Sequence, residues 1–226
     1  MTLRQRLTLR YGVPLVQKYI PDWANFERYR DANAQLAPPT PGEPRVVFMG
    51  DSITEGWMSW PGAFFPGKPY VNRGINGQTT PQMLVRFRPD VIALQPRLTV
   101  IQGGSNDIAR NPAPGTLEEI VWNLASMADL AHANGIRVVL GSHLPVTDAI
   151  LPQTNRRRPE KILALNVRIK SYAQAQGIVY LDYFPAMLGG DGMLRKELTF
   201  DGLHPNAAGY AVMSPLAEKA IEEALR

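Results

Sequence analysis

The sequence of 226 residues contains no cysteine. This absence excludes disulfide bonds, zinc sites with cysteine ligands, iron–sulfur clusters and a thiol nucleophile. It leaves the redox compartment open, because a chain without thiols is indifferent to it. The sequence also lacks any run of about 18 consecutive apolar residues, so it predicts no transmembrane helix.

The sequence also lacks a large excess of charge of one sign. It has 24 Lys and Arg against 20 Asp and Glu, a formal net charge of +4. That is mild for a nucleic-acid-binding protein, and no aromatic stacking pattern accompanies the basic clusters in residues 1–21 and at residues 156–158. We interpret both clusters as solvated surface, with nucleic-acid binding through residues 156–158 as an alternative. The basic N-terminus lacks the apolar run of a signal peptide, so we expect a cytoplasmic protein or an exported one that has lost its leader.

The composition excludes a disordered chain, since 45% of residues are hydrophobic and 19% are charged. No linker-like stretch divides the sequence, so its length fits one sizeable domain better than two small ones. We expect residues 45–226 to form that domain. Residues 1–44 precede its first strand and are expected to be an N-terminal helical extension packed on the domain, with helix-like patterning over residues 23–36.

Five short, β-branched apolar runs alternate with longer segments of helical period. The predicted strands are residues 45–49, 70–73, 98–102, 136–140 and 178–181. Their apolar residues are continuous more than alternating, which is typical of parallel strands buried on both faces. Strand–helix alternation implies right-handed βαβ units. The sequence therefore predicts a three-layer α/β/α fold, a flavodoxin-like five-stranded parallel sheet with helices on both faces, that ends in a helix over about residues 207–224.

Capping residues and glycines mark where these helices begin and end. Thr116 and Glu119 have the spacing of a capping box, and Thr80 followed by proline is typical of an N-cap. Gly135 and Gly177 stand where a helix is expected to end before a strand.

Small and short polar residues follow four of the predicted strands. Ligands of an open parallel sheet bind beyond the carboxyl ends of its strands, so we expect these residues to face one cleft. The four stretches are Gly50-Asp51-Ser52-Ile53-Thr54, Gly74-Ile75-Asn76-Gly77, Gly103-Gly104-Ser105-Asn106-Asp107 and Gly141-Ser142-His143. Each is weak evidence alone, but together they indicate a functional site.

A hydrolytic serine needs a base within hydrogen-bonding reach, a group that orients the base, and donors for the oxyanion. Ser52 is the candidate nucleophile, although it could instead cap the helix that follows. Of the three histidines, His132 falls on the solvent side of a helix, and His143 is either a pocket residue or a structural one. His204 follows Asp201 by three residues in a glycine-containing turn, a spacing that also fits a non-catalytic contact.

Other motif classes have little support. Thr54 stands where the G-x-S-x-G turn of α/β-hydrolases requires glycine. Neither the spacing of a P-loop nor G-x-G-x-x-G follows the first strand, so the sequence does not favour nucleotide binding. The glycine-rich residues 189–192 carry too few oxygen ligands for a cation loop and are interpreted as a turn.

Four separated motifs occur in a set order along the chain. They are Gly50-Asp51-Ser52, Gly74, Gly104-Ser105-Asn106-Asp107, and Asp201 three residues before His204. This combination resembles the SGNH hydrolase superfamily, also called GDSL esterases and lipases, over about residues 45–225. Within it, residues 72–80 (NRGINGQTT) look most like the platelet-activating-factor acetylhydrolase-like and carbohydrate acetylesterase-like branches.

The resemblance implies a role for each matching residue. Ser52 would be the nucleophile, His204 the base, and Asp201 the acid that orients it. The oxyanion donors would be the backbone N–H groups of Ser52 and Gly74 and the side-chain amide of Asn106. Family members of this kind need no metal or organic cofactor, so we expect none.

The sequence thus predicts a serine esterase that hydrolyses short acyl esters, above all acetyl esters, through a Ser–His–Asp triad and an acyl-enzyme. The alcohol side stays open between an O-acetylated sugar and a small lipid, with an acyl thioester as a third option. A lysophospholipase- or thioesterase-type hydrolase and a non-catalytic binding module are the alternatives.

Four residues are candidates for the substrate pocket: Asp51, Trp57, Asn76 and His143. The aromatic-rich residues 57–65 either wall the acyl site or stack a sugar, or else pack as a cap on the sheet edge. The expected partner is a small ester substrate, without nucleic acid or stable membrane insertion. The resemblance to platelet-activating-factor acetylhydrolases is also compatible with a homodimer.

Overall fold

The computed structural model describes residues 22–60, 62–109 and 116–226. Its five strands are parallel and lie in the order β2-β1-β3-β4-β5, the order of flavodoxin-like folds. They are β1 (Val46–Gly50), β2 (Tyr70–Gly74), β3 (Leu98–Gln102), β4 (Arg137–Gly141) and β5 (Val179–Leu181). Each end lies within one residue of the sequence prediction, and the predicted α/β fold is confirmed.

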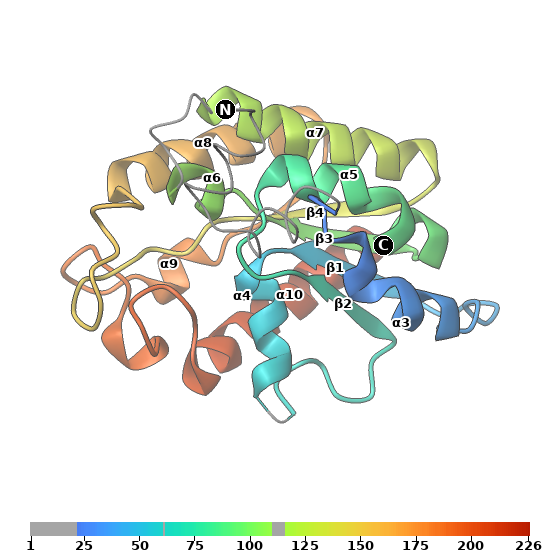
Figure 1. The fold of residues 1–226 in the computed structure, drawn as a ribbon, viewed down its shortest axis with the longest axis horizontal. Coiled ribbons are helices and arrows are strands. Elements are labelled where there is room, and N and C mark those ends of the chain that lie inside the picture. Colours follow the sequence, from blue (N-terminus) through green and yellow to red (C-terminus); the bar gives the residue numbers. More distant parts are fainter. Residues whose placement is uncertain (1–21, 61, 110–115) are drawn as a thin grey trace, which may run out of the picture.

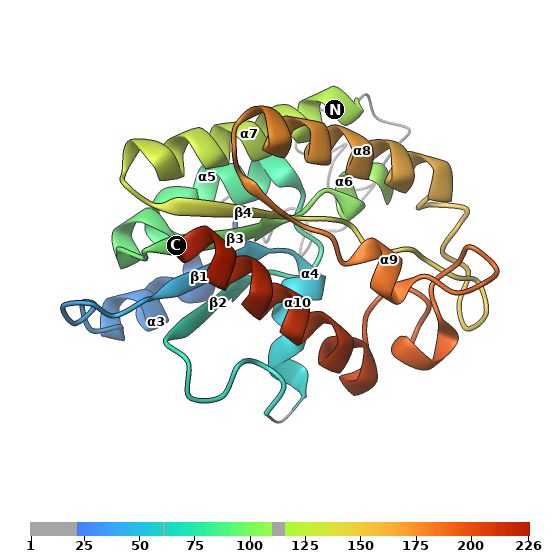
Figure 2. The ribbon, with the colours of Figure 1, turned by 180° about the vertical axis from the view of Figure 1, so that it is seen from behind.

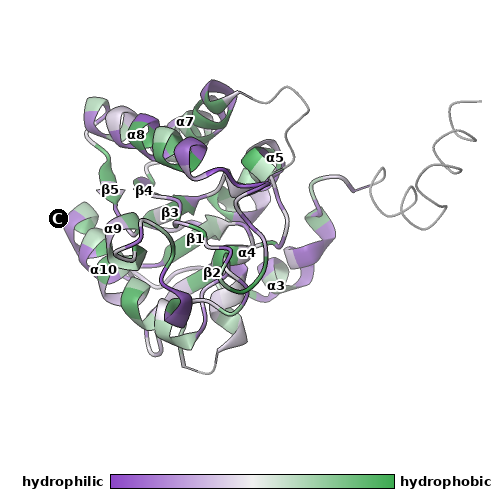
Figure 3. Ribbon diagram, turned by 90° about the vertical axis from the view of Figure 1, so that its left-hand side faces the viewer, coloured by the Kyte–Doolittle hydropathy of each residue, from purple (hydrophilic) through white to green (hydrophobic). Residues whose placement is uncertain are grey.

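Helices cover both faces of this sheet (Figure 1, and from behind Figure 2). One layer consists of α5 (Thr80–Asp90), α7 (Leu117–Ala133) and α8 (Pro159–Ala175), and the other is dominated by α10 (Ala207–Leu225). Successive residues of a strand point to opposite faces. Val47 of β1 accordingly packs with the first layer, whereas Val46 and Phe48 pack with the second. Figure 3 shows the sheet edge-on between the two layers.

Shorter elements complete the described part of the chain. They are α3 (Arg30–Gln35), α4 (Ser52–Glu55), α6 (Ser105–Ala109), α9 (Phe184–Met187) and the 3₁₀ helices η1 (Phe26–Tyr29), η2 (Gly56–Ser59), η3 (Ile92–Leu94) and η4 (Lys196–Leu198). Two of them, α4 and α6, directly follow strands at the carboxyl edge of the sheet, where the sequence predicted a site.

The capping predictions hold with one exception. Thr116 and Glu119 form the predicted capping box of α7. Gly135 and Gly177 follow α7 and α8 with φ of 71° and 64°, a conformation that glycine adopts readily. Thr80, however, is the first residue of α5 and not its N-cap, which is Thr79. The Thr80 hydroxyl donates instead to Asp107 at 2.7 Å. This tertiary contact engages Thr80, and the adjacent Thr79 is the N-cap.

The described part of the N-terminal region packs beside β2 and α5. Helical structure predicted for residues 23–36 begins at Phe26, as η1 followed by α3. Asn33 of α3 donates to Oδ1 of Asp90 in α5 at 2.7 Å. The division into an extension of residues 1–44 and a domain of residues 45–226 stays a prediction, and the basic residues 1–21 lie outside the described residues. Within the described ranges, no helix is both long and apolar enough to cross a bilayer.

Candidate active site

Ser52 is the first residue of α4, one position beyond the residue that caps this helix. Oδ1 of Asp51 accepts the backbone N–H of Ile53 at 2.9 Å, so Asp51 fills the capping role that the sequence left open for Ser52. The Ser52 hydroxyl is therefore available for another contact. Its Oγ lies 2.9 Å from Nε2 of His204, which the chain brings in from 152 residues away.

The turn before α10 orients His204. Oδ2 of Asp201 lies 2.6 Å from Nδ1 of the imidazole, while Oδ1 accepts the backbone N–H groups of Leu203 at 2.9 Å and His204 at 2.8 Å. Burial by itself would raise the pKa of the Asp201 carboxyl, but these hydrogen bonds outweigh it and hold the pKa below its ordinary value. Asp201 thus stays a carboxylate that fixes the ring, and Phe200 stacks on the imidazole with ring centroids 5.7 Å apart.

Asn106, at the start of α6, lies close to Asp51, the residue before Ser52. Its Nδ2 donates to the backbone carbonyl of Gln78 at 2.9 Å and lies 3.4 Å from Oδ2 of Asp51. Its Oδ1 accepts from Nη2 of Arg157 at 3.1 Å. The amide is therefore oriented with its nitrogen toward residues 51 and 78, and its oxygen toward the arginine.

Gly74 does not present its N–H group as the sequence analysis expected. That N–H donates to Oδ1 of Asn72 at 2.9 Å, and the residue is buried at the end of β2. A Cβ placed on Gly74 would lie 2.1 Å from the backbone nitrogen of Glu55. Glycine is thus required here because the backbone of α4 approaches closely, and the expectation that Gly74 is an oxyanion donor is corrected.

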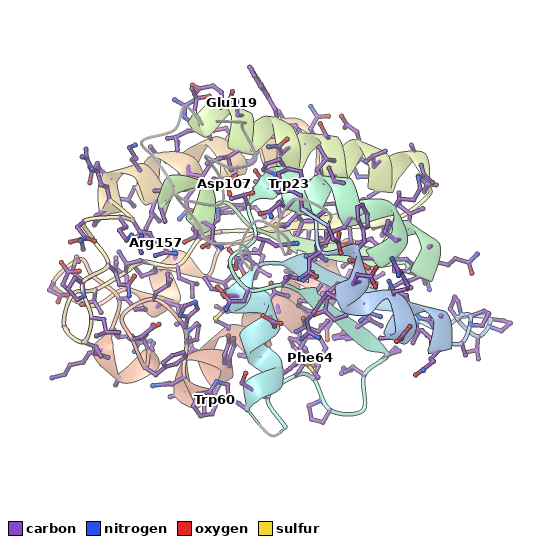
Figure 4. All side chains as sticks on the ribbon, viewed as in Figure 1. Trp23, Trp60, Phe64, Asp107, Glu119 and Arg157 are labelled. Atoms are coloured by element: carbon purple, nitrogen blue, oxygen red, sulfur yellow. The ribbon has the colours of Figure 1, made fainter. Side chains whose placement is uncertain are left out.

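An open cavity of about 760 Å³ lies over Ser52 and His204. Its lining combines the two candidate catalytic residues with aromatic, charged and small side chains: Arg28, Ser52, Glu55, Gly56, Met58, Ser59, Trp60, Asn76, Phe200, His204, Pro205 and Tyr210. Figure 4 shows Trp60 and Phe64 on the side of the molecule below α4. Hydrophobic, hydrogen-bonding and ionic groups therefore all line the cavity over the Ser52 hydroxyl.

Of the four candidate pocket residues, only Asn76 lines this cavity. Asp51 is buried beneath Ser52, where burial raises the pKa of its carboxyl to about 6, partly offset by the N–H of Ile53. Trp57 packs among the aromatic rings of the core. His143 is buried against the backbone of Gly104, and burial lowers its pKa to about 4. These three positions are corrections, because each side chain turns into the protein interior.

The aromatic-rich residues 57–65 divide between the two roles that the sequence left open. Met58 and Trp60 line the cavity, whereas Phe64 and Phe65 join Trp57 in a cluster around Phe48 of β1. Pro61 lies outside the described residues. One stretch of chain thus serves both as a wall of the site and as a cap on the sheet.

Sequence reasoning missed Arg28 and Arg157 as residues of this site. Arg157 belongs to a run of three arginines that we interpreted as solvated, yet its Nε donates to Oγ of Ser105 at 2.9 Å. Arg28 comes from η1, in a region with no recognisable motif. No group of metal-ligating side chains occurs within the described ranges.

Comparison with known proteins yields a family and several relatives. Residues 48–212 match the model of the family described as GDSL-like lipase/acylhydrolase. The esterase TesA of Pseudomonas aeruginosa is 31% identical over 176 residues, which cover 72% of this chain and 80% of TesA. The platelet-activating factor acetylhydrolase IB subunit alpha1 of Pongo abelii is 27% identical over 177 residues, which cover 75% of this chain and 71% of that protein.

The fold is shared with solved structures at higher identity. A GDSL-like lipase from Bacteroides thetaiotaomicron superposes with a TM-score of 0.81 at 46% identity, and the match covers 89% of this chain and 98% of that one. The match to that structure therefore extends well beyond the residues that the family model covers.

Proposed function

The chain belongs to the GDSL-like lipase/acylhydrolase family and is a carboxylic ester hydrolase, and from that premise we propose that it cleaves short-chain acyl esters, acetyl esters above all, with Ser52, His204 and Asp201 as its catalytic triad. The observation that carries the proposal is the continuous contact Ser52 Oγ–His204 Nε2 and His204 Nδ1–Asp201 Oδ2, at 2.9 and 2.6 Å, on the wall of an open cavity.

In this mechanism the Ser52 oxygen attacks the ester carbonyl carbon while His204 Nε2 takes the hydroxyl proton. Asp201 keeps Nδ1 protonated and stabilises the imidazolium that forms. When the tetrahedral intermediate collapses, the bond to the alcohol oxygen breaks and His204 gives its proton to the leaving alcohol. Water then attacks the acyl-enzyme with the same proton transfers, which releases the carboxylic acid and restores the Ser52 hydroxyl.

Three donors are proposed for the oxyanion: the backbone N–H of Ser52, the Nδ2 group of Asn106 and the backbone N–H of Gly77. An amide nitrogen carries two hydrogens, so Asn106 can keep its bond to Gln78 while the hydrogen that faces Oδ2 of Asp51 at 3.4 Å turns to an oxyanion. Gly77 replaces Gly74 because it stands between Asn76, which lines the cavity, and Gln78, whose carbonyl contacts Asn106. Its φ of 75° also favours glycine.

Two packed aromatic rings beside the cavity support a preference for a short acyl group. Trp57 and Tyr210 pack ring to ring at 5.0 Å, and Tyr210 lines the cavity while Trp57 is fully buried. We infer that these packed rings leave little room for a long acyl chain on this side of the cavity. A relative named platelet-activating factor acetylhydrolase supports acetyl as the group transferred to Ser52. The rim formed by the exposed Met58 and Phe200 and the half-buried Trp60 offers apolar surface to the alcohol part of the substrate.

The test is hydrolysis of 4-nitrophenyl esters with acyl chains from two to twelve carbons, together with intact mass after a fluorophosphonate probe. We expect the highest kcat/KM at two to four carbons and a single adduct that Ser52→Ala abolishes. Ser126→Ala, which changes a serine on α7 away from the cavity, is the matched control and should retain both turnover and adduct.

Other results would assign a different function. A maximum at eight carbons or more would favour the lysophospholipase- or thioesterase-type alternative. Absence of both turnover and adduct would contradict activation of Ser52 and favour a binding module.

A further inference from the structure

The N-terminal segment, residues 22–35, lies outside the range matched by the family model and yet contacts the candidate active site. Two of its hydrogen bonds reach residues 74–78, called here the 74–78 loop, which begins with the last residue of β2. At the beginning of that loop, the Tyr29 hydroxyl donates to the backbone carbonyl of Gly74. At its end, Nε2 of Gln78 donates to the backbone carbonyl of Ala24 at 2.7 Å. The segment therefore holds the loop at both ends.

A third connection reaches the middle of the loop through Glu55. Nη2 of Arg28 lies 3.0 Å from Oε1 of Glu55, and Oε2 of Glu55 accepts the backbone N–H of Asn76 at 2.7 Å. All three residues line the substrate cavity. Arg28 thus belongs to the cavity wall although it precedes β1.

The N-terminal segment is itself fixed to the body of the protein. Oδ1 of Asn33 accepts from Nε of Arg73 at 2.8 Å, and Nδ2 of Asn33 donates to Asp90. The Tyr29 ring lies against the guanidinium groups of Arg28 and Arg73, whose carbons are 5.1 and 4.7 Å from its centroid. The hydroxyl is therefore presented to Gly74 by a ring with little freedom to turn.

We propose that Tyr29 is a positioning residue of the esterase site, which acts by holding the 74–78 loop through the carbonyl of Gly74. The proposal rests on the proposed function, because that loop carries Gly77 and the Gln78 carbonyl that orients Asn106. A small displacement of an oxyanion donor weakens its contact with the transition state while the ground-state ester still binds. Tyr29 then affects turnover more than substrate binding.

The hydroxyl is suited to this role over the working pH range. Burial raises the pKa of Tyr29 above its ordinary value, so the group keeps its proton and donates throughout neutral pH. Gly74 is buried, so its carbonyl would lose a partner if the hydroxyl were removed.

Tyr29→Phe tests the proposal, because it retains the ring between the two guanidinium groups and removes only the oxygen. With 4-nitrophenyl acetate at a temperature well below the unfolding transition, we expect kcat to fall about tenfold, less than the loss of a whole oxyanion donor, with KM within about twofold. Tyr180→Phe is the matched control. It removes a hydroxyl that also contacts a backbone carbonyl, that of Asn166 at 3.4 Å, and should leave both constants unchanged.

Hydrogen exchange supplies a readout that does not depend on activity. In Tyr29→Phe we expect the amides of residues 74–78 to exchange about fivefold faster than in the wild type, with the core strands unaffected. Arg28→Gln should also lower kcat, and the double variant should lose less than the product of the two single losses, because both residues hold one loop.

The outcomes separate this proposal from the proposed function. If the wild type turns over esters and Tyr29→Phe retains kcat within twofold with unchanged exchange in the loop, Tyr29 is not a positioning residue. If the wild type turns over no ester, the proposed function fails. The amide exchange rates then decide by themselves whether Tyr29 holds the 74–78 loop. Faster exchange at residues 74–78 would then support the hold on the loop, and unchanged exchange would overturn it.

Discussion

Nη2 of Arg157 donates to Oδ1 of Asn106 at 3.1 Å. This contact keeps the amide oxygen on the arginine and turns the amide nitrogen toward Asp51, the residue before Ser52. Nε of the same guanidinium donates to Oγ of Ser105, so the arginine holds two consecutive residues of α6. Figure 4 shows Arg157 near α6; the residue lies in the loop before α8, whereas Ser52 begins α4. The side-chain amide proposed as an oxyanion donor is therefore oriented by a side chain more than fifty residues further along the chain.

Replacement of this pair should produce graded losses. Asn106→Ala removes a proposed oxyanion donor and should lower kcat by about 10²–10³ with KM little changed. Arg157→Leu leaves the donor but frees its orientation, so we expect a smaller loss of about tenfold in kcat. Steady-state kinetics on 4-nitrophenyl acetate would measure both, with the exposed neighbour Arg156→Leu as the control. Equal kcat in Arg157→Leu and Arg156→Leu would contradict the orienting role.

The contact between Ser52 and His204 predicts strongly non-additive losses. Ser52→Ala and His204→Ala should each lower kcat by about 10⁴–10⁶. The double variant should have the same kcat as the less active of the two single variants, because the two residues act as a unit. Kinetics with purified variants would measure this, with circular dichroism to establish that each is folded. Losses that multiply in the double variant would show that the two residues act independently.

Asp201→Asn tests the role of the carboxylate with nearly unchanged shape. The asparagine amide can present a donor to Nδ1 and so stabilise the tautomer that has no free lone pair at Nε2. We expect kcat to fall by about 10²–10⁴ while KM changes little. The rate of fluorophosphonate labelling of Ser52 should fall in parallel. A loss below tenfold in both assays would mean that Asp201 only shapes the turn.

The buried imidazole of His143 predicts a pH dependence of stability. Burial lowers its pKa to about 4 in the folded protein, whereas in the unfolded chain it is about 6.5. Below pH 6.5 only the unfolded chain takes up this proton, so the stabilisation is lost as the pH falls from 6.5 toward 4. Urea unfolding would measure the free energy of unfolding of the wild type and of His143→Gln at pH 7 and at pH 4.5. Between these pH values the wild type should lose up to about 3 kcal/mol more than His143→Gln, which has no imidazole at this position. The same difference at both pH values would contradict a buried neutral imidazole.

The sequence predicted the sheet well because its three central strands, β1, β3 and β4, contain continuous buried apolar runs. The short length of the runs and their β-branched residues favour strands over buried helices, and all five strands were placed within one residue. Ser52, Asp201 and His204 were predicted as a triad from four motifs in order, and the fold brings their side chains into contact although Ser52 and His204 lie 152 residues apart.

The errors share a physical cause, which is that side-chain direction depends on tertiary packing. Gly74 ends β2 and Gly77 follows three residues later, and only the approach of α4 shows that Gly74 is enclosed. Trp57 and Trp60 are three residues apart, yet one is fully buried and the other lines the cavity. Arg157 stands between two exposed arginines and turns inward because Ser105 and Asn106 offer oxygen acceptors.

The hold of residues 22–35 on residues 74–90 limits how this protein can be recombined with its relatives. A chimera with its crossover at the predicted boundary between residues 44 and 45 would take Tyr29 and Asn33 from one parent and Gly74 and Asp90 from the other. The part after the junction would carry all four sequence motifs, but the hydrogen bonds between the two parts would join sequences that had never been paired. A crossover after Asp90 keeps these partners together, so in a library of chimeras it should be the more frequent junction among active clones.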